Sequence, residues 1–117
     1  MLTRETLYWI LTWNKDSDVK PNDVIGKYLF FSDDKSILQK VGEDILREYN
    51  LPSMKISTGK NSNAEVGFGY VLCIYTDNFS LKDILKDKEV PGLNYRYFKT
   101  DSDTRAGKYS VQYKKSQ

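Results

Sequence analysis

The sequence predicts an α+β fold, a largely antiparallel β-sheet with two helices packed on one of its faces. Segments rich in β-branched and aromatic residues, each bounded by polar turns, predict six strands. Two segments with apolar residues at helical spacing interrupt the strands, one after the second strand and one after the fourth. This order implies neighbouring antiparallel strands with both helices on one side. The chain of 117 residues suits a single domain, 1–117, with one hydrophobic core.

The N-terminal part supplies the first two predicted strands. Residues 7–13 alternate two largely apolar or β-favouring sets, which predicts a strand that is buried on at least one face. The polar, turn-rich residues 14–23 predict a surface loop. Residues 26–31 follow as the second strand.

The first helix is predicted by its cap and by its apolar stripe. Ser32, Asp33 and Asp34 are candidates for the N-cap. The apolar residues that recur at a spacing of 3.6 are Ile37, Leu38, Val41, Ile45, Leu46 and Tyr49. The Asn-Leu-Pro sequence at 50–52 ends this helix.

The second half of the chain repeats the alternation of strands and helix. Residues 53–58 and 67–76 predict the third and fourth strands, with an exposed loop at 59–65 between them. Ser80 with Asp83 resembles a capping box and predicts a short second helix that Pro-Gly ends. Residues 93–99 predict an aromatic-rich strand and residues 108–113 a last strand, with a polar loop between them.

The formal net charge is only +2, but its distribution along the chain is uneven. Residues 94–117 contain 6 of the 18 basic residues and only 2 of the 16 acidic ones. Positive charge is therefore concentrated near the C-terminal end, where it can attract a phosphate or another anion.

Absent residue types exclude several kinds of chemistry. The chain has no histidine, which excludes His-based triads, His metal sites and imidazole acid-base catalysis. The single Cys73 excludes an intramolecular disulfide and thiolate zinc sites, and it favours a reducing compartment. No segment approaches the roughly 20 apolar residues that span a bilayer. We expect a cytoplasmic protein with no membrane association, no metal and no cofactor.

The clearest candidates for function lie near the C-terminus. Strand alternation puts Tyr95, Tyr97 and Lys99 on one face of their strand, and Arg96 with Phe98 on the other. Cationic groups beside hydroxyls hold phosphate through charge-assisted hydrogen bonds, and aromatic rings stack on bases. The alternative interpretation is a solvated sheet face whose tyrosines cover the core.

Two earlier segments could add to such a site. Lys55 and Ser57 face away from the apolar side of the third predicted strand. Trp9 and Trp13 fall on the same face of the first predicted strand, where they could flank a planar ring. Tryptophan in a strand is more often part of the core, so both interpretations stay open.

Four segments, in this order and spacing, resemble a known family. They are Gly26-Lys27-Tyr28-Leu29-Phe30, Met54-Lys55-Ile56-Ser57-Thr58, Val71-Leu72-Cys73-Ile74-Tyr75-Thr76-Asp77, and Tyr97-Phe98-Lys99-Thr100-Asp101 followed by Thr104-Arg105-Ala106-Gly107-Lys108-Tyr109. The family is a small group of archaeal, bacterial and eukaryotic proteins that carries the label of a phosphothreonine lyase domain. The resemblance spans residues 8–109.

The resemblance implies a fold similar to that of the cap-binding translation initiation factors. In those proteins a curved antiparallel sheet is backed by helices and holds a nucleotide between aromatic rings on its concave side. By motif position, the residues that would face such a cleft are Lys27, Lys55, Lys99 and Arg105, with Trp9, Trp13 and Tyr97 as stacking partners.

The lyase label implies a catalytic group that this sequence lacks. Phosphothreonine lyases use a lysine base, arginines that clamp the phosphate and a histidine acid, and this chain has no histidine. Lys55 or Lys27 would abstract a proton only if burial lowered its pKa. The sequence therefore leans towards binding rather than catalysis, with no residue assigned as catalytic.

Three functions from different classes follow. We expect first a non-enzymatic binding module for a small phosphorylated ligand, with a nucleotide as the leading candidate. Such a domain would recognise an RNA end or sequester a nucleotide signal, for example for a phage that counters host nucleotide signalling. The second hypothesis is a lyase or phosphoesterase that uses the same basic residues. The third is an interaction protein whose exposed strand pairs with another chain, a second copy included.

Overall fold

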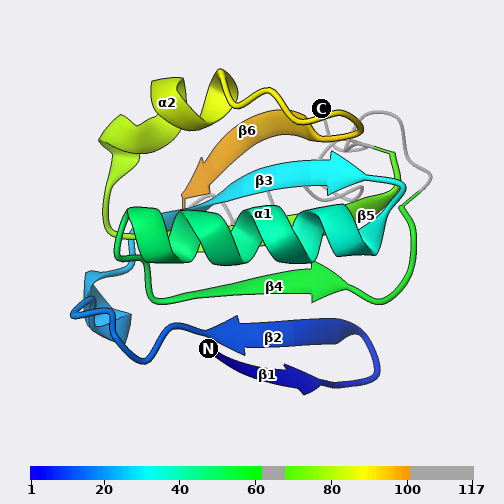
Figure 1. Cartoon of the computed structure of the whole chain (residues 1–117). Helices are drawn as coiled ribbons and strands as arrows, with labels where there is room; N and C mark the ends of the chain where they lie inside the picture. The colour runs from blue at the N-terminus through cyan, green and yellow to red at the C-terminus, as the bar shows by residue number, and fades with distance from the viewer. Residues whose placement is uncertain (62–67, 101–117) are drawn as a thin grey trace, which may run out of the picture.

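The computed structural model describes residues 1–61 and 68–100, which form an α+β fold around one curved, unclosed sheet (Figure 1). The six described strands are β1 (Leu2–Glu5), β2 (Trp9–Trp13), β3 (Gly26–Ser32), β4 (Ser53–Ser57), β5 (Tyr70–Thr76) and β6 (Asn94–Thr100). Their order in the sheet is β1-β2-β4-β5-β3-β6, and every neighbouring pair is antiparallel. The predicted fold class is confirmed. The predicted strand at 108–113 lies outside the described residues.

Two α-helices lie on the same side of this sheet. Helix α1 (Lys35–Glu48) crosses in front of the central strands, and α2 (Lys82–Lys86) lies beside β6 (Figure 1). Two short 3-10 turns, η1 (Pro21–Asp23) and η2 (Phe79–Leu81), belong to the connections. In the described ranges, no helix is long and apolar enough to cross a membrane.

Helix α1 follows from the cap and stripe that the sequence predicts. Asp34 is the N-cap, and hydrogen bonds from the hydroxyl and the backbone N–H of Ser36 lower the pKa of its carboxyl group. The buried residues of the helix are Leu38, Val41, Gly42, Ile45 and Leu46. Beyond the last turn, Asn50 adopts a positive φ of 55° that reverses the chain direction.

The sheet has two different faces. The face under α1 carries the main core, to which the strands contribute Tyr28, Phe30, Met54, Ile56, Leu72 and Ile74. The opposite face carries a smaller apolar cluster of Leu29, Phe31 and Cys73, with Trp9, Val71 and Tyr97 packed partly against it. No helix belongs to this second cluster in the part of the chain that the structure describes. The alternation of each strand decides which side chains reach it.

The N-terminal strand was not predicted, and the next one is shorter than predicted. The first strand of the sequence prediction begins at residue 7, whereas β2 begins at Trp9 because Thr6 and Trp9 close a tight turn. The residues between them, Leu7 and Tyr8, are therefore exposed in this turn. All four residues of β1 are exposed at the sheet edge, so they have no apolar alternation from which a strand could be predicted.

The second helix starts differently from the prediction. The predicted capping box at Ser80 is wrong, because the side chain of Asn78 accepts the hydrogen bond from the Ser80 backbone N–H at 2.9 Å. A 3-10 turn precedes the α-helix, which is only five residues long. The Asn78 carbonyl oxygen also accepts a hydrogen bond from the buried Tyr28 hydroxyl, and burial raises the pKa of that phenol to about 12.

A β-bulge in β6 corrects the predicted alternation of its aromatic residues. Leu29 pairs with Tyr97, but the next residue of β3, Phe30, pairs with Tyr95, so β6 has one extra residue at this point. Tyr95 consequently lies on the face under α1, where its ring centroid is 5.3 Å from that of Phe30. Strict alternation predicts that Tyr95 shares a face with Lys99. In the structure the two residues lie on opposite faces.

Candidate anion-binding site

Three of the four predicted basic residues meet on the sheet face that is opposite α1. Lys27 on β3 pairs directly with Lys99 on β6. Lys55 on β4 pairs with Cys73 on β5, and Cys73 in turn pairs with Leu29. Strand order and register therefore place lysines from three strands around one apolar patch.

These side chains line a cavity of about 230 Å³. Its described lining residues are Trp9, Lys27, Leu29, Phe31, Lys55, Asn61, Val71, Cys73, Tyr97 and Lys99. The floor of the cavity is apolar, since the buried side chains of Leu29, Phe31 and Cys73 form it. Five of the seven predicted ligand-binding residues thus share one cavity, and no Asp or Glu is found among its described lining residues.

Aromatic rings hold two of the ammonium groups. The Lys55 Nζ atom lies 4.0 Å from the centroid of the Trp9 ring and 5.9 Å from that of Tyr75. The Lys27 Nζ atom lies 5.8 Å from the Tyr75 ring. Cation–π attraction therefore favours these positions without neutralising either charge.

One of the cationic groups in the cavity, Lys55, is partly desolvated. Burial lowers the pKa of Lys55, and the nearby charge of Lys27 lowers it further. Burial also raises the pKa of the Cys73 thiol, although the surrounding lysines oppose that shift. Within the described ranges, no carboxylate lies within ion-pairing distance of Lys27 or Lys55.

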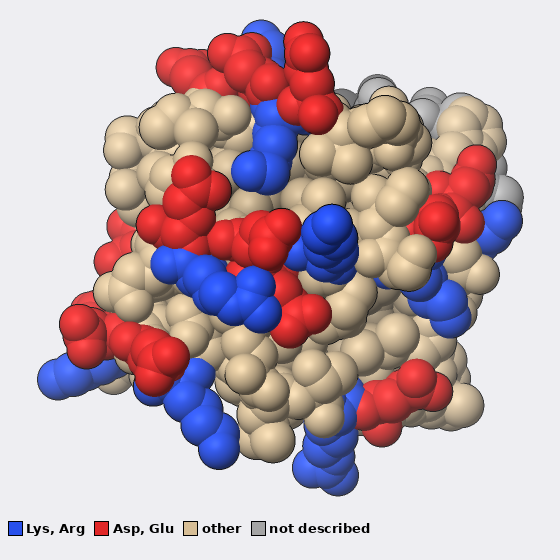
Figure 2. All heavy atoms as spheres, viewed as in Figure 1, with Lys and Arg blue, Asp and Glu red and all other residues tan. Residues whose placement is uncertain are grey.

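The face that carries α1 has a different charge pattern. Lys and Arg are interspersed there with Asp and Glu (Figure 2). Arg47, for example, lies 3.2 Å from the carboxylate of Asp44 and 3.7 Å from that of Glu43. Charges on this face therefore largely compensate each other.

One predicted site residue lies outside the cavity, and another lies outside the described residues. Trp13 lies on the same sheet face as Trp9 but lines a separate groove, so the two indoles do not flank a single ring. Arg105 lies outside the described residues. The prediction that Lys55 faces away from the core under α1 is confirmed.

Sequence reasoning missed the contribution of Tyr75, which lies close to both Lys27 and Lys55. The alternation of β5 indicates this position, because Tyr75 is two residues from Cys73 and so lies on the same side of the strand. What the sequence did not give was the pairing of Tyr75 with Lys27 on one side and Ser53 on the other.

Comparisons of the chain with protein-family models, with curated proteins and with solved structures give no match. The resemblance to proteins labelled as phosphothreonine lyase domains therefore stays a prediction, and so does the likeness to cap-binding initiation factors.

Proposed function

We propose that this protein binds a small phosphorylated ligand, in the first place a nucleotide, in the lysine cavity. The observation that carries the proposal is the convergence of Lys27, Lys55 and Lys99 on one cavity. Ammonium groups from three strands can surround a phosphate and donate charge-assisted hydrogen bonds to its oxygens.

The energetics of Lys55 support an anionic ligand. Its charge is partly desolvated, which is unfavourable, and an anion in the cavity would offset that cost. Trp9 holds the Lys55 ammonium by its ring face and so fixes the donor in advance of binding. Binding without turnover is what a protein that recognises or sequesters a nucleotide requires.

Thermal-shift screening tests this proposal. The ligands are mononucleotides, cyclic nucleotides, cap analogues and phosphopeptides, each measured on wild type, on Lys27→Met and on Lys55→Met. A ligand at 100 times its Kd stabilises the fold by about 2.7 kcal/mol, which shifts the Tm of a domain of this size by several degrees. Lys40→Met on the exposed side of α1 is the control for loss of one positive charge.

The proposal predicts a shift that is confined to phosphorylated compounds, is reduced in both cavity variants and is retained in Lys40→Met. No shift with any phosphorylated compound would contradict the proposal. The remaining hypothesis would then be interaction through a strand, since β6 forms one edge of the described sheet.

A lyase is the second candidate, because the pKa of Lys55 is lowered as a lysine base requires. In an elimination, Lys55 would take the α-proton of a phosphothreonine residue while the carbon–oxygen bond to the phosphate breaks and a carbon–carbon double bond forms. Phosphate release from a phosphothreonine peptide measures this activity. Lys55→Arg separates the functions, because arginine still binds phosphate but cannot act as the base.

A further inference from the structure

We infer that an apolar groove beside the lysine cavity is the second half of the same site. In this inference the groove holds the planar base of a nucleoside diphosphate or triphosphate whose phosphates occupy the cavity. The inference rests on the proposed function and adds the ligand class and its orientation.

The groove has a volume of about 550 Å³ and lies where β2 ends and β3 and β4 begin. Its described lining residues are Trp13, Asn14, Lys15, Ser17, Val19, Pro21, Val24, Pro52, Ser53 and Tyr75. Most of its walls are aromatic, proline or valine side chains. The indole of Trp13 is 37% exposed there, which leaves a large flat apolar surface open on a concave site.

Strand register places the groove and the cavity on the same face of the sheet. Trp13 pairs with Ser53, Ser53 with Tyr75, and Tyr75 with Lys27, so the side chains form one row across the same face. Tyr75 lines the groove and also lies 5.8 Å from the Lys27 Nζ atom and 5.9 Å from the Lys55 Nζ atom. Tyr75 therefore lies between the two halves, where the ribose would connect the base to its 5′-phosphates.

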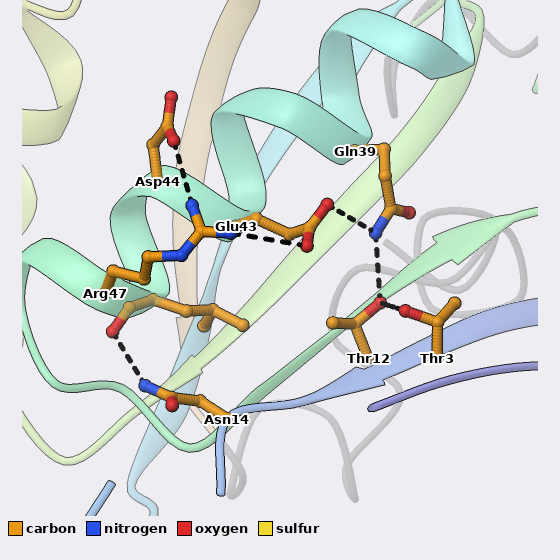
Figure 3. Close-up of polar contacts among 8 residues, drawn as sticks. Thr3, Thr12, Asn14, Gln39, Glu43, Asp44 and Arg47 are labelled. Atoms are coloured by element: carbon orange, nitrogen blue, oxygen red, sulfur yellow. Dashed lines mark hydrogen bonds and ion pairs between the residues drawn. The ribbon is translucent and has the colours of Figure 1, made fainter. Parts of the chain in front are cut away.

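The wall of the groove is anchored before any ligand binds. The Asn14 side chain donates a hydrogen bond to the Leu46 carbonyl oxygen of α1 at 3.1 Å (Figure 3), and its backbone N–H donates to Pro52 at 2.9 Å. The Ser17 hydroxyl donates to the Asn50 carbonyl oxygen at 2.8 Å. A preformed wall reduces the ordering cost of binding a rigid, flat group.

The two halves differ in the chemistry that they recognise. The cavity presents cationic donors on an apolar floor, and the groove presents a flat aromatic surface flanked by prolines. A ring system stacks on such a surface irrespective of the base, because every base has a π-face. Several ammonium groups close together favour a ligand with more than one phosphate over a monophosphate.

The experiment compares ADP, GDP, adenosine and inorganic pyrophosphate by calorimetric titration of wild type and Trp13→Ala. We expect both diphosphate nucleotides to bind wild type about 5- to 150-fold more tightly than pyrophosphate, as stacking of one base provides. Trp13→Ala should lose this advantage and keep its affinity for pyrophosphate. Trp13→Phe retains a ring and should keep part of the advantage.

Tryptophan fluorescence shows where the base lies, because the chain has only two tryptophans. In Trp9→Phe the only indole is Trp13 in the groove, and in Trp13→Phe it is Trp9 in the cavity. Nucleotides should quench Trp13 in the first variant, whereas pyrophosphate should not.

The outcomes separate this inference from the proposed function. Pyrophosphate binding with no gain from the nucleoside and no quenching of Trp13 would overturn the inference and leave the cavity as an anion site. Absence of binding by every phosphorylated ligand would overturn both. A phosphopeptide that binds more tightly than the nucleotides and quenches Trp13 would overturn the inference by assigning the groove to a peptide side chain.

Discussion

Lys55 combines a partly desolvated charge with a fixed position in the cavity. Its Nζ atom lies over the ring of Trp9, and its strand partner is the buried Cys73. Its pKa is lowered from the ordinary value of 10.5, chiefly by burial. The residue is therefore the most informative position at which to test the site.

Ligand binding should depend on the ionisation of Lys55. Only the ammonium form attracts phosphate, so affinity should fall as the pH rises through the lowered pKa of Lys55, before exposed lysines lose their charge. Titration calorimetry over a range of alkaline pH measures this dependence. In Lys55→Arg the fall should disappear, because guanidinium stays charged. A pH profile that is the same in wild type and variant would contradict the role of Lys55.

The same pKa shift predicts an effect on stability. The unfolded chain binds the Lys55 proton more tightly than the folded one, so the charged side chain destabilises the fold. This effect is largest below the folded-state pKa and fades as the pH approaches 10.5. Lys55→Met should raise the Tm at neutral pH, by a margin that shrinks in alkaline buffer. A lower Tm for Lys55→Met than for wild type at neutral pH would contradict this prediction.

Among the secondary-structure elements, the sequence predicts most strands and the long helix, but it does not predict the bulge in β6 or the edge strand β1. The cap at Asp34 and the stripe of α1 are local signals, which explains why α1 was predicted with a suitable start. The bulge that turns Tyr95 under α1 depends on pairing between β3 and β6, which no local pattern contains. The exposed edge strand β1 was missed because it has no buried face.

The contact between α1 and β4 is close enough to test. A Cβ atom at Gly42 would lie 2.2 Å from the Met54 sulfur. At this distance one of the two groups must move. Gly42→Ala should therefore lower the free energy of unfolding, by about 1–3 kcal/mol as overpacking of a core does. Chemical denaturation measures it. Gly59→Ala is the control, because its Cβ meets no described atom within 4 Å. Equal stability of both variants would mean that the flexible end of the Met54 side chain moves aside at little cost.

The cap of α1 gives a second test at this scale. Asp34→Ala should lower the Tm at neutral pH, because the Ser36 backbone N–H loses its acceptor. The contribution of the carboxylate is present above the ordinary pKa of 3.8 and is lost as the pH falls through the lowered folded-state value. The difference between wild type and variant should therefore narrow in strong acid. Asp33→Ala also removes one negative charge but leaves the Asp34 cap in place. An equal fall in Tm in that control would argue against capping.

For the whole molecule, topology decides which residues form the site. Lys55 and Lys27 are far apart in the sequence, and they share a cavity because β5 lies between β4 and β3. Alternation could predict which side of its own strand each lysine occupies. It could not predict the strand order, nor that Trp13 lies in a groove separate from Trp9. The resemblance to a known family stays a prediction, and the spacing of the lysines comes only from the sheet.

In the proposed function Lys27 and Lys55 bind the phosphates of a nucleotide, and titration calorimetry with a nucleoside diphosphate is the sharpest test of this role. We predict saturable binding to wild type and to Lys40→Met at one site. The Lys27→Met, Lys55→Met double variant should lose at least about tenfold in affinity, since each charged hydrogen bond contributes about 1.5–3 kcal/mol. Unchanged affinity in the double variant, with its fold intact by circular dichroism, would rule out phosphate binding by these two lysines.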